Sequence, residues 1–290
     1  MFLADQWQDY EVLDTGDGEK LERWGDVILR RPDPQVIWPK KDKALWKMAQ
    51  AHYRRSEKGG GEWDFLQKLP ERWQVDCLGL KFYVRPTGFK HTGLFPEQAA
   101  NWAYMMRLIE KRKRAGSPVK VLNLFGYTGG ASMACAKAGA HVTHVDAAKG
   151  MVQWAKENRA LAGLDESSFR FIVEDALAFV QREIRRGNSY QGILMDPPSY
   201  GRGPNGEVWK LEDELFNLVK TCADALSEDA LFMLINSYTT GFQASVLSNI
   251  LKRTVQDHRG GEIDSEELCL PVTSGGVLPC GCTGRWQAHE

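Results

Sequence analysis

Three acidic residues in the second half of the chain have the spacing of a ligand site. Asp146, Asp175 and Asp196 each end or closely follow an apolar run, and a turn of small residues, FGYTGG at 125–130, follows an earlier one. Backbone N–H groups in such a turn can hold a phosphate or a carboxylate. A carboxylate at the end of the next strand can accept hydrogen bonds from both ribose hydroxyls. The pattern predicts a nucleotide-like ligand.

The elements that must position these acids alternate regularly after Pro118. Strands are expected at 120–125, 141–146, 169–174, 190–195 and 230–236. Helices are expected at 129–138, 149–162, 176–186, 210–226 and 241–254. This alternation predicts a doubly wound, mostly parallel α/β sheet of seven strands. Its last two strands, near 264–270 and 283–288, have no helix between them and should form an antiparallel edge hairpin.

The first part of the chain has a different pattern of polar and apolar residues. Residues 9–39 alternate polar and apolar positions between turn signals, which predicts a small antiparallel unit. Residues 43–56 have helical spacing, and residues 73–85 look like a hairpin. We therefore expect three parts: a small β-rich N-terminal domain at 1–88, a lid segment with a bridging helix at 89–118, and a catalytic domain at 119–290. For the glycine-rich stretch 88–98, an ordinary interdomain linker is the alternative to a lid.

Each acid and the glycine turn also has a purely structural interpretation. The turn at 125–130 could serve helix–sheet packing alone, and Asp146 or Asp175 could cap the helix that follows it. No Lys-Ser/Thr pair follows the turn, which excludes a P-loop, and the three-glycine spacing of dinucleotide dehydrogenases is missing. The three acids at one sheet edge favour the ligand interpretation.

Residues 196–200, DPPSY, are the sharpest chemical signal. Two prolines stiffen the turn and expose the Pro197 carbonyl, while Asp196 can accept a hydrogen bond from an exocyclic amine. Tyr200 offers a face on which a flat base can stack. Such groups orient a planar nitrogen compound, although a rigid loop with an N-cap would also use two prolines. The loop at 201–206 could close over a substrate, with Arg202 reaching a phosphate, or could be an ordinary surface loop.

Charge is distributed unevenly. Residues 1–120 hold 22 Lys and Arg against 17 Asp and Glu, and residues 121–290 hold 15 against 21. Basic side chains are interleaved with Trp38, Trp46 and Tyr53 in residues 30–58, a stretch that could track a phosphate backbone and stack on bases. A solvated face over a few core aromatics is the alternative. The first of these interpretations makes RNA the expected partner.

At these residues the chain resembles the class I S-adenosylmethionine (SAM) dependent methyltransferases. More narrowly, it resembles the bacterial ribosomal-RNA large-subunit group of cytosine-C5 and guanine-N7 enzymes. The resemblance covers roughly residues 88–255 and rests on five motifs: residues 92–98 (TGLFPEQ), 122–131 (LNLFGYTGGA), 144–150 (HVDAAKG), 154–158 (WAKEN) and 196–200 (DPPSY).

The resemblance implies a set of site residues. Residues 125–130 would contact the methionine end of SAM, Asp146 its ribose and Asp175 its adenine, while residues 92–98 would cover it. The implied cofactor contacts are Thr92, Phe95, Gln98, Phe125, Gly126, Tyr127, Thr128, Gly129, Gly130, Asp146, Ala147, Asp175, Ala176 and Asp196. The implied catalytic residues, which face the base, are Asp196, Pro197, Pro198 and Tyr200. No metal is expected.

One departure from the group bears on the substrate. Cytosine-C5 enzymes attack the ring with a thiolate located after the fourth strand or at the end of the fifth. Here those places hold Ser199 and residues 236–238 (NSY). A covalent mechanism would need Cys280 or Cys282 in the site. Direct transfer to a base nitrogen fits better.

Three functions therefore compete: an RNA base-nitrogen methyltransferase, a small-molecule or protein methyltransferase favoured by the acidic second half, and a SAM-binding protein without catalysis. The 290-residue chain shows no apolar run long enough for a leader or a membrane span, so we expect a cytoplasmic protein. Its six cysteines suit reduced thiols. The sequence leaves the oligomeric state open.

Overall fold

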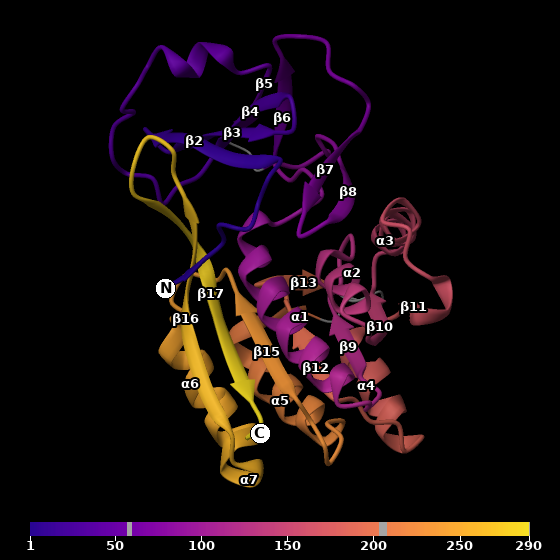
Figure 1. Cartoon of the computed structure of the whole chain (residues 1–290). Coiled ribbons are helices and arrows are strands. Elements are labelled where there is room, and N and C mark those ends of the chain that lie inside the picture. The colour runs from indigo at the N-terminus through magenta and orange to yellow at the C-terminus, as the bar shows by residue number, and fades with distance from the viewer. Residues whose placement is uncertain (57–59, 203–207, 290) are drawn as a thin grey trace. The chain divides into compact units, whose positions relative to one another are not determined.

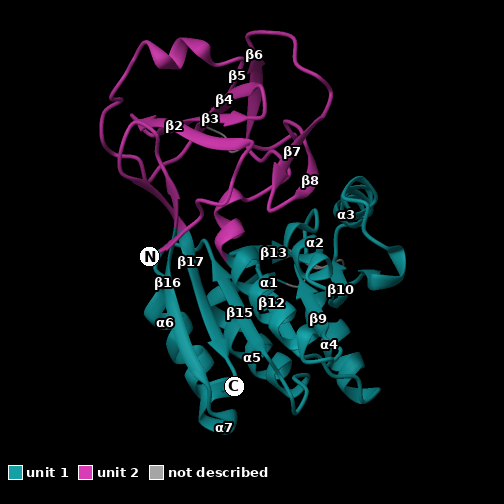
Figure 2. Ribbon diagram, viewed as in Figure 1, with its two compact units in different colours: residues 1, 101–268, 281–290 teal, residues 2–100, 269–280 magenta. Residues whose placement is uncertain are grey.

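The computed structural model describes residues 1–56, 60–202 and 208–289. The chain divides into two compact units, shown in teal and magenta in Figure 2. Unit 1 comprises Met1, Asn101–Leu268 and Gly281–Glu290. Unit 2 comprises Phe2–Ala100 and Cys269–Cys280.

Unit 1 is built on the predicted doubly wound sheet (Figure 1). Its central strands are β9 (Lys120–Leu124), β10 (His141–Asp146), β11 (Phe169–Val173), β12 (Gly192–Met195) and β15 (Phe232–Ser237). The strands β16 (Glu262–Pro271) and β17 (Val277–Gln287) follow. Within the described residues the sheet has eight strands rather than seven, in the order β1-β16-β17-β15-β12-β9-β10-β11, because the two-residue β1 (Phe2–Leu3) adds an edge.

Pairing is parallel from β15 through β12, β9 and β10 to β11, and β17 pairs antiparallel with β15. The expected edge hairpin is thus confirmed. The glycine-rich segment 274–284, whose glycines are expected to serve this hairpin, is only partly a turn. Only Gly275 and Gly276 adopt positive φ, and the chain is already extended from Val277.

Helices cover both faces of this sheet. They are α1 (Ala99–Arg114), α2 (Gly130–Lys137), α3 (Lys149–Leu161), α4 (Ala176–Arg185), α5 (Leu211–Asp224) and α6 (Ala244–Leu251), which continues through a π-helical turn (Lys252–Gln256) into α7 (Asp257–Arg259). The side chains of Leu122, Leu124 and Val145 pack with α4, α5 and α6. On the opposite face Asn123 bonds to Ser132 of α2, and Met105 of α1 meets Cys135. Alternate strand residues therefore face opposite helix layers.

Unit 2 is β-rich, as expected. Strands β2 (Tyr10–Gly16), β3 (Glu19–Trp24) and β4 (Val27–Pro32) form an antiparallel meander, extended by β5 (Ala51–Arg55) and β6 (Gly61–Phe65). A separate hairpin joins β7 (Trp73–Cys77) and β8 (Leu80–Val84), where the sequence predicted it.

The helix predicted at 43–56 is wrong. Only a short 3-10 turn, Leu45–Met48, forms there, and β5 begins at Ala51. The reason lies in the burial pattern: Ala51 and Tyr53 are buried while Arg54 is exposed, which is the period-two pattern of a strand. The glycine run at residues 59–61, which predicts a loop, falls partly outside the described residues, because 57–59 are not described.

Candidate active site

Two of the three predicted acids, Asp146 and Asp196, lie in one row at the carboxyl edge of the large sheet. Met195 pairs with Leu124, and Leu124 pairs with Val145, so the next residues in the three strands are Asp196, Phe125 and Asp146. Neighbouring strands are about 4.8 Å apart. Asp196 and Asp146 therefore flank the start of the glycine loop. This edge is where open α/β sheets bind ligands.

The loop between β9 and α2 has an unusual backbone. Phe125, Tyr127 and Gly129 all adopt left-handed φ, of 58°, 51° and 88°. Such angles are uncommon for residues other than glycine, and at an aromatic residue they cost of order 1–3 kcal/mol. The Gly126 N–H donates to the Val145 carbonyl at 2.9 Å, and Gly129 N–H donates to Gly126. The fold thus holds a strained loop at the ligand edge.

Asp146 links this loop to the start of α3 through its two carboxylate oxygens. Oδ2 accepts from the Tyr127 N–H at 2.9 Å and Oδ1 from the Ala148 N–H at 2.8 Å. Ala148 is the N-cap of α3 and makes no side-chain capping bond. Asp146 is therefore not the N-cap of this helix, which was the structural alternative for this residue. A carboxylate has about four lone-pair sites, which leaves acceptor capacity for ribose hydroxyls. Ala147, beside it, is exposed.

The glycines of the loop are required by packing against protein. A Cβ atom at Gly126 would lie 2.5 Å from Nδ1 of His144, one at Gly130 would overlap the Trp102 ring, and one at Gly129 would lie 2.9 Å from Met133 Cε. These contacts support the helix–sheet packing interpretation of the glycines. Ligand binding by the loop then depends on its N–H groups and on the conformation that this packing imposes.

A buried polar cluster supports the loop from below. His144 Nδ1 lies 2.9 Å from Ser132 Oγ, which also accepts from Asn123 at 2.8 Å. Burial lowers the pKa of His144 to about 4, so its ring is neutral at pH 7. Asn158 of α3, fully buried, donates to the Thr128 carbonyl at 2.9 Å. The loop is therefore held by β10, α2 and α3 together.

Asp175 is the N-cap of α4, and its Oδ1 accepts from the Ala178 N–H at 2.9 Å. The capping interpretation is thus correct for one oxygen. Asp175 is exposed and Ala176, the first residue of α4, is buried. Because Asp146 pairs with Val173, Asp175 lies two residues beyond the row of acids.

The Asp-Pro-Pro turn after β12 is clamped by a small hairpin, β13 (Tyr200–Arg202) and β14 (Val208–Lys210). The indole N–H of Trp209 donates to the Pro198 carbonyl at 2.7 Å, and the Leu211 N–H donates to the Ser199 carbonyl. Trp209 also lies 6.1 Å from the Phe125 ring, centroid to centroid. The turn and the glycine loop thus share one aromatic neighbour.

Within this turn Pro197 is buried and Pro198 exposed, while Tyr200 is 51% exposed. An exposed ring at this position is available for stacking. The predicted closing loop at 201–206, with Arg202, falls mainly outside the described residues, since 203–207 and the Arg202 side chain are not described.

The three remaining predicted cofactor contacts, Thr92, Phe95 and Gln98, belong to unit 2. Thr92 and Gln98 are buried and Phe95 is partly buried. Among the residues that the structure describes, none is a hydrogen-bond partner of the Thr92 hydroxyl. Their approach to the glycine loop of unit 1 stays a prediction, as does the bridging role of α1.

The surroundings of the two candidate thiols do not activate either one as a nucleophile, because burial raises the pKa of both. Cys282 pairs with Ser237 across β17 and β15, but its Sγ donates to the Phe242 carbonyl at 3.0 Å and it packs in the core beside α6. Burial raises the pKa of Cys282 to about 11. Cys280 belongs to unit 2, and burial raises its pKa well above the usual value. All six cysteines are free.

Sequence reasoning missed Trp209, His144 and Asn158 as supports of the site. Trp209 gave no local signal, since it lies eleven residues beyond Pro198 in a short, weakly patterned strand. His144 and Asn158 lie within the motifs HVDAAKG and WAKEN, but no role was predicted for either side chain.

Known proteins share this fold and this sequence pattern. The S-adenosylmethionine-dependent methyltransferase family matches residues 39–241. The ribosomal RNA large subunit methyltransferase K/L of Shewanella frigidimarina (strain NCIMB 400) is 34% identical over 224 residues, covering 74% of this chain and 28% of that protein. The chain thus spans under a third of the length of the curated relatives it matches.

Two solved structures extend the comparison. A SAM-dependent methyltransferase from Agrobacterium tumefaciens is 39% identical with a TM-score of 0.93, covering 99% of this chain and 93% of that one. A putative SAM-dependent methyltransferase from Streptococcus mutans is 18% identical with a TM-score of 0.76, covering 98% and 76%, which shows the shared fold.

The doubly wound sheet and the acids at its carboxyl edge together define a class I, Rossmann-like methyltransferase. The chain belongs to the S-adenosylmethionine-dependent methyltransferase family, and SAM is its methyl donor. In the described part of the chain, no helix is both long and apolar enough to cross a membrane.

Proposed function

We propose that the chain transfers a methyl group from SAM to a nitrogen atom of an RNA base, with ribosomal RNA as the leading substrate. The observation that carries this proposal is the Asp196 turn, stiffened by two prolines and clamped by Trp209 next to the glycine loop. We assign catalysis to residues 119–290 and substrate binding to residues 1–88.

The residues at the sheet edge fit SAM. Asp146 keeps acceptor capacity for the ribose hydroxyls, and the loop at 125–130 presents backbone N–H groups for the methionine carboxylate. Asp175, with one oxygen engaged in the helix cap, has a second oxygen for the adenine amino group. Thr92, Phe95 and Gln98 would cover the cofactor.

The methyl donor supplies an electrophilic carbon on a positively charged sulfur, and the protein needs only to align a nitrogen lone pair with it. Asp196 would accept a hydrogen bond from the base N–H and receive the proton that the nitrogen sheds. Tyr200 would hold the ring by stacking. Alignment of this kind supplies on the order of 7–11 kcal/mol at best. No nucleophilic thiol is required, in agreement with the burial of Cys282.

The relatives support an RNA substrate. The Shewanella protein is named for ribosomal RNA, and it is 34% identical to this chain. The acidic balance of residues 121–290 favours the competing function, a small-molecule or protein methyltransferase, because an acidic surface repels phosphates.

The experiment that tests the role of Asp196 compares wild type with Asp196→Ala on undermodified ribosomal RNA. We expect the turnover number to fall by about 10²- to 10⁴-fold, the usual contribution of a positioned acid or base. The SAM dissociation constant, measured by calorimetry, should stay within about twofold. Asp213→Ala, an exposed acid in the first turn of α5, is the control. Normal turnover by Asp196→Ala would remove the assigned role.

A further inference from the structure

Unit 2 presents a set of aromatic side chains on one face of the β5–β6 pair. Tyr53 pairs with Trp63 and Ala51 with Phe65, so Tyr53, Trp63 and Phe65 share that face. Tyr53 is buried and meets the Trp63 ring edge to face at 5.4 Å, while Trp63 and Phe65 are stacked at 6.4 Å and 27°. The buried tyrosine therefore supports Trp63, which in turn stacks with Phe65.

The segment after β8 brings a further exposed aromatic residue, Phe89, next to Trp63 through its backbone. The Trp63 indole N–H donates to the carbonyls of Thr87, at 2.8 Å, and Phe89, at 3.2 Å. This bond holds residues 87–89 against the sheet. Phe89 is 68% exposed and Phe65 56% exposed, although burying either ring would be favourable by roughly 1.5–3 kcal/mol. Neighbouring exposed rings on a structured surface indicate a binding face.

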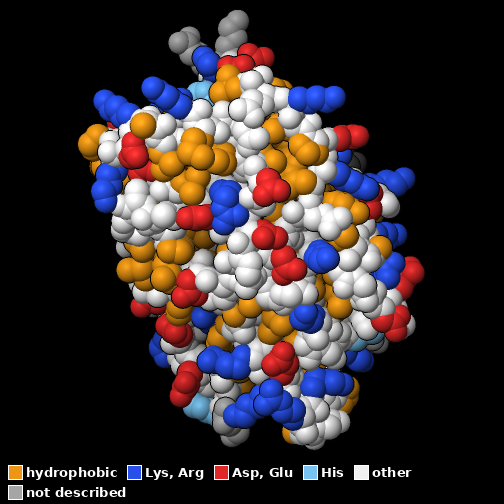
Figure 3. All heavy atoms as spheres, turned by 45° about the horizontal axis from the view of Figure 1, so that its top comes forward, with side chains coloured by type: hydrophobic (Ala, Val, Ile, Leu, Met, Phe, Trp, Pro, Cys, Tyr) orange, Lys and Arg blue, Asp and Glu red, His pale blue; other side chains and the backbone are white. Residues whose placement is uncertain are grey.

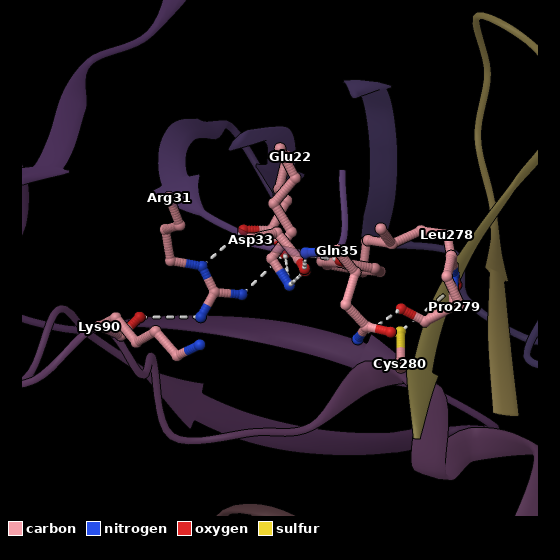
Figure 4. A network of polar contacts seen from close by, with 10 residues as sticks. Glu22, Arg31, Asp33, Gln35, Lys90, Leu278, Pro279 and Cys280 are labelled. Carbon is pink, nitrogen blue, oxygen red and sulfur yellow. Dashed lines mark hydrogen bonds and ion pairs between the residues drawn. The ribbon is translucent and has the colours of Figure 1, made fainter. Parts of the chain in front are cut away.

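Cations surround the same segment. The Arg31 guanidinium forms a buried pair with Glu22 and donates to the Lys90 carbonyl at 2.9 Å, and Figure 4 shows the Lys90 side chain alongside that guanidinium. Lys20 is engaged by Asp33 at 3.4 Å. Lys90 therefore lies next to two cations, Lys20 and Arg31, that are already paired with Asp33 and Glu22.

Lys90 itself has no carboxylate within 4.0 Å among the described residues, and its half-buried ammonium is repelled by Lys20, Arg31 and Arg55. Burial, followed by these like charges, lowers its pKa. Arg55 lies on the same face of β5 as Tyr53 and is exposed. A phosphate would relieve this repulsion. The charge here is complementary to an anion.

The basic and aromatic segment at residues 30–58 is less suitable for binding RNA than the rings described above. In residues 30–58, Arg30 and Lys40 pair with Glu19 and lie over the Trp46 ring, and both Trp46 and Tyr53 are buried. These two rings cannot stack on bases. Figure 3 shows exposed hydrophobic patches bordered by Lys and Arg on the face that it draws. Trp38, the third aromatic residue of that segment, is 38% exposed, and its indole N–H donates to Thr15 Oγ1. On the β5–β6 face and in the segment 87–89 after β8, the rings that are not buried are Trp63, Phe65 and Phe89.

We propose that Arg55, Trp63, Phe65, Phe89 and Lys90, called here the aromatic–cation surface, bind a single-stranded segment of RNA. Phe65 and Phe89 stack on successive bases, and Arg55 and Lys90 contact the phosphates between them. This inference rests on the proposed function, because it names the part of the chain that holds the RNA while unit 1 methylates it.

The test measures binding of the full chain to a fluorescein-labelled single-stranded RNA of about twelve nucleotides, by anisotropy across a salt series. Arg55→Ala with Lys90→Ala should lower the slope of log K against log salt by about 1.4, or about 0.7 for each lost phosphate contact. Phe65→Ala and Phe89→Ala should each weaken binding by about 5- to 150-fold.

Two control variants match these changes. Arg54→Ala lies on the opposite face of β5, where Arg54 pairs with Asp64, and should leave the slope unchanged. Phe216→Ala removes a ring that is 47% exposed on α5 in unit 1 and should leave the affinity unchanged. Because Phe65 and Phe89 are exposed, their variants keep the fold even if Lys90→Ala perturbs unit 2.

The outcomes separate this inference from the proposed function. If wild type methylates ribosomal RNA but neither binds the single strand nor loses affinity in the aromatic variants, the aromatic–cation surface is overturned and the function stands. If wild type methylates no RNA, the function fails. Tight binding of an acidic peptide in place of RNA, with the same variants defective, would also overturn the inference.

Discussion

Replacement of Asp146 by Asn tests whether the carboxylate at the end of β10 organises the glycine loop and the cofactor. In the structure its two oxygens accept the N–H groups of Tyr127 and Ala148, on either side of the strand end. Asn keeps the shape of the side chain and one acceptor oxygen. It turns its amide NH2 toward the second backbone N–H, where two donors then face each other.

The expected losses of stability and of SAM affinity follow from these contacts. One hydrogen bond to a charged group contributes about 1.5–3 kcal/mol, so the variant should unfold with a free energy lower by about that amount. If Asp146 also accepts the ribose hydroxyls, the uncharged amide weakens that contact by a similar amount. The SAM dissociation constant should then rise by about 10- to 150-fold.

Calorimetric titration with SAM and urea unfolding measure the two effects separately. Asp165→Asn is the matched control, because the Asp165 carboxylate also accepts a backbone N–H, from Ser167, but in the turn that precedes β11. It should leave the SAM affinity unchanged. An Asp146→Asn protein that binds SAM as tightly as wild type would refute the reasoning, whatever its stability.

Three further predictions concern the support of the site. Gly126→Ala should cost about 1–3 kcal/mol of unfolding free energy and reduce SAM binding, because the methyl group would overlap His144, whereas Gly150→Ala, in open space at the start of α3, should be neutral or slightly stabilising; equal effects would contradict this. Trp209→Phe, which loses the bond to the Pro198 carbonyl, should lower the turnover number and raise the KM for RNA with SAM affinity unchanged; kinetics at saturating SAM measure this, and wild-type values would dismiss the clamp. The native state holds His144 neutral, with a pKa of about 4 against about 6.5 when unfolded, so the unfolded state binds more protons between these values. The unfolding free energy should therefore fall as the pH drops from about 6.5 toward 4, and a flat profile across that window would be inconsistent with a neutral buried ring.

The doubly wound sheet could be predicted because its signals are local and repeated. Each parallel strand is an apolar run that ends at a polar residue, and each helix has its own period. Asp146 and Asp196 were found for the same reason, since strand ends of a parallel sheet meet at one edge. The register of β12, β9 and β10 then sets their order.

Contacts made by tertiary packing could not be predicted. Residues 43–56 have helical spacing, yet pairing with β6 selects a strand over Ala51–Arg55, because tertiary pairing overrides local preference. The burial of Trp46 under Arg30 and Lys40 likewise depends on Glu19 from another strand. Basic and aromatic residues that are close in sequence therefore identified one exposed ring, Trp38, but not those of β6 and of the segment after β8.

The most direct test of the account follows a labelled methyl group from SAM into separated pools of undermodified RNA, DNA, protein and small metabolites. The account predicts label in RNA, recovered after digestion as a nucleoside methylated on a base nitrogen. Label confined to protein or small molecules, label on a base carbon, or SAM binding without transfer to any pool would contradict it.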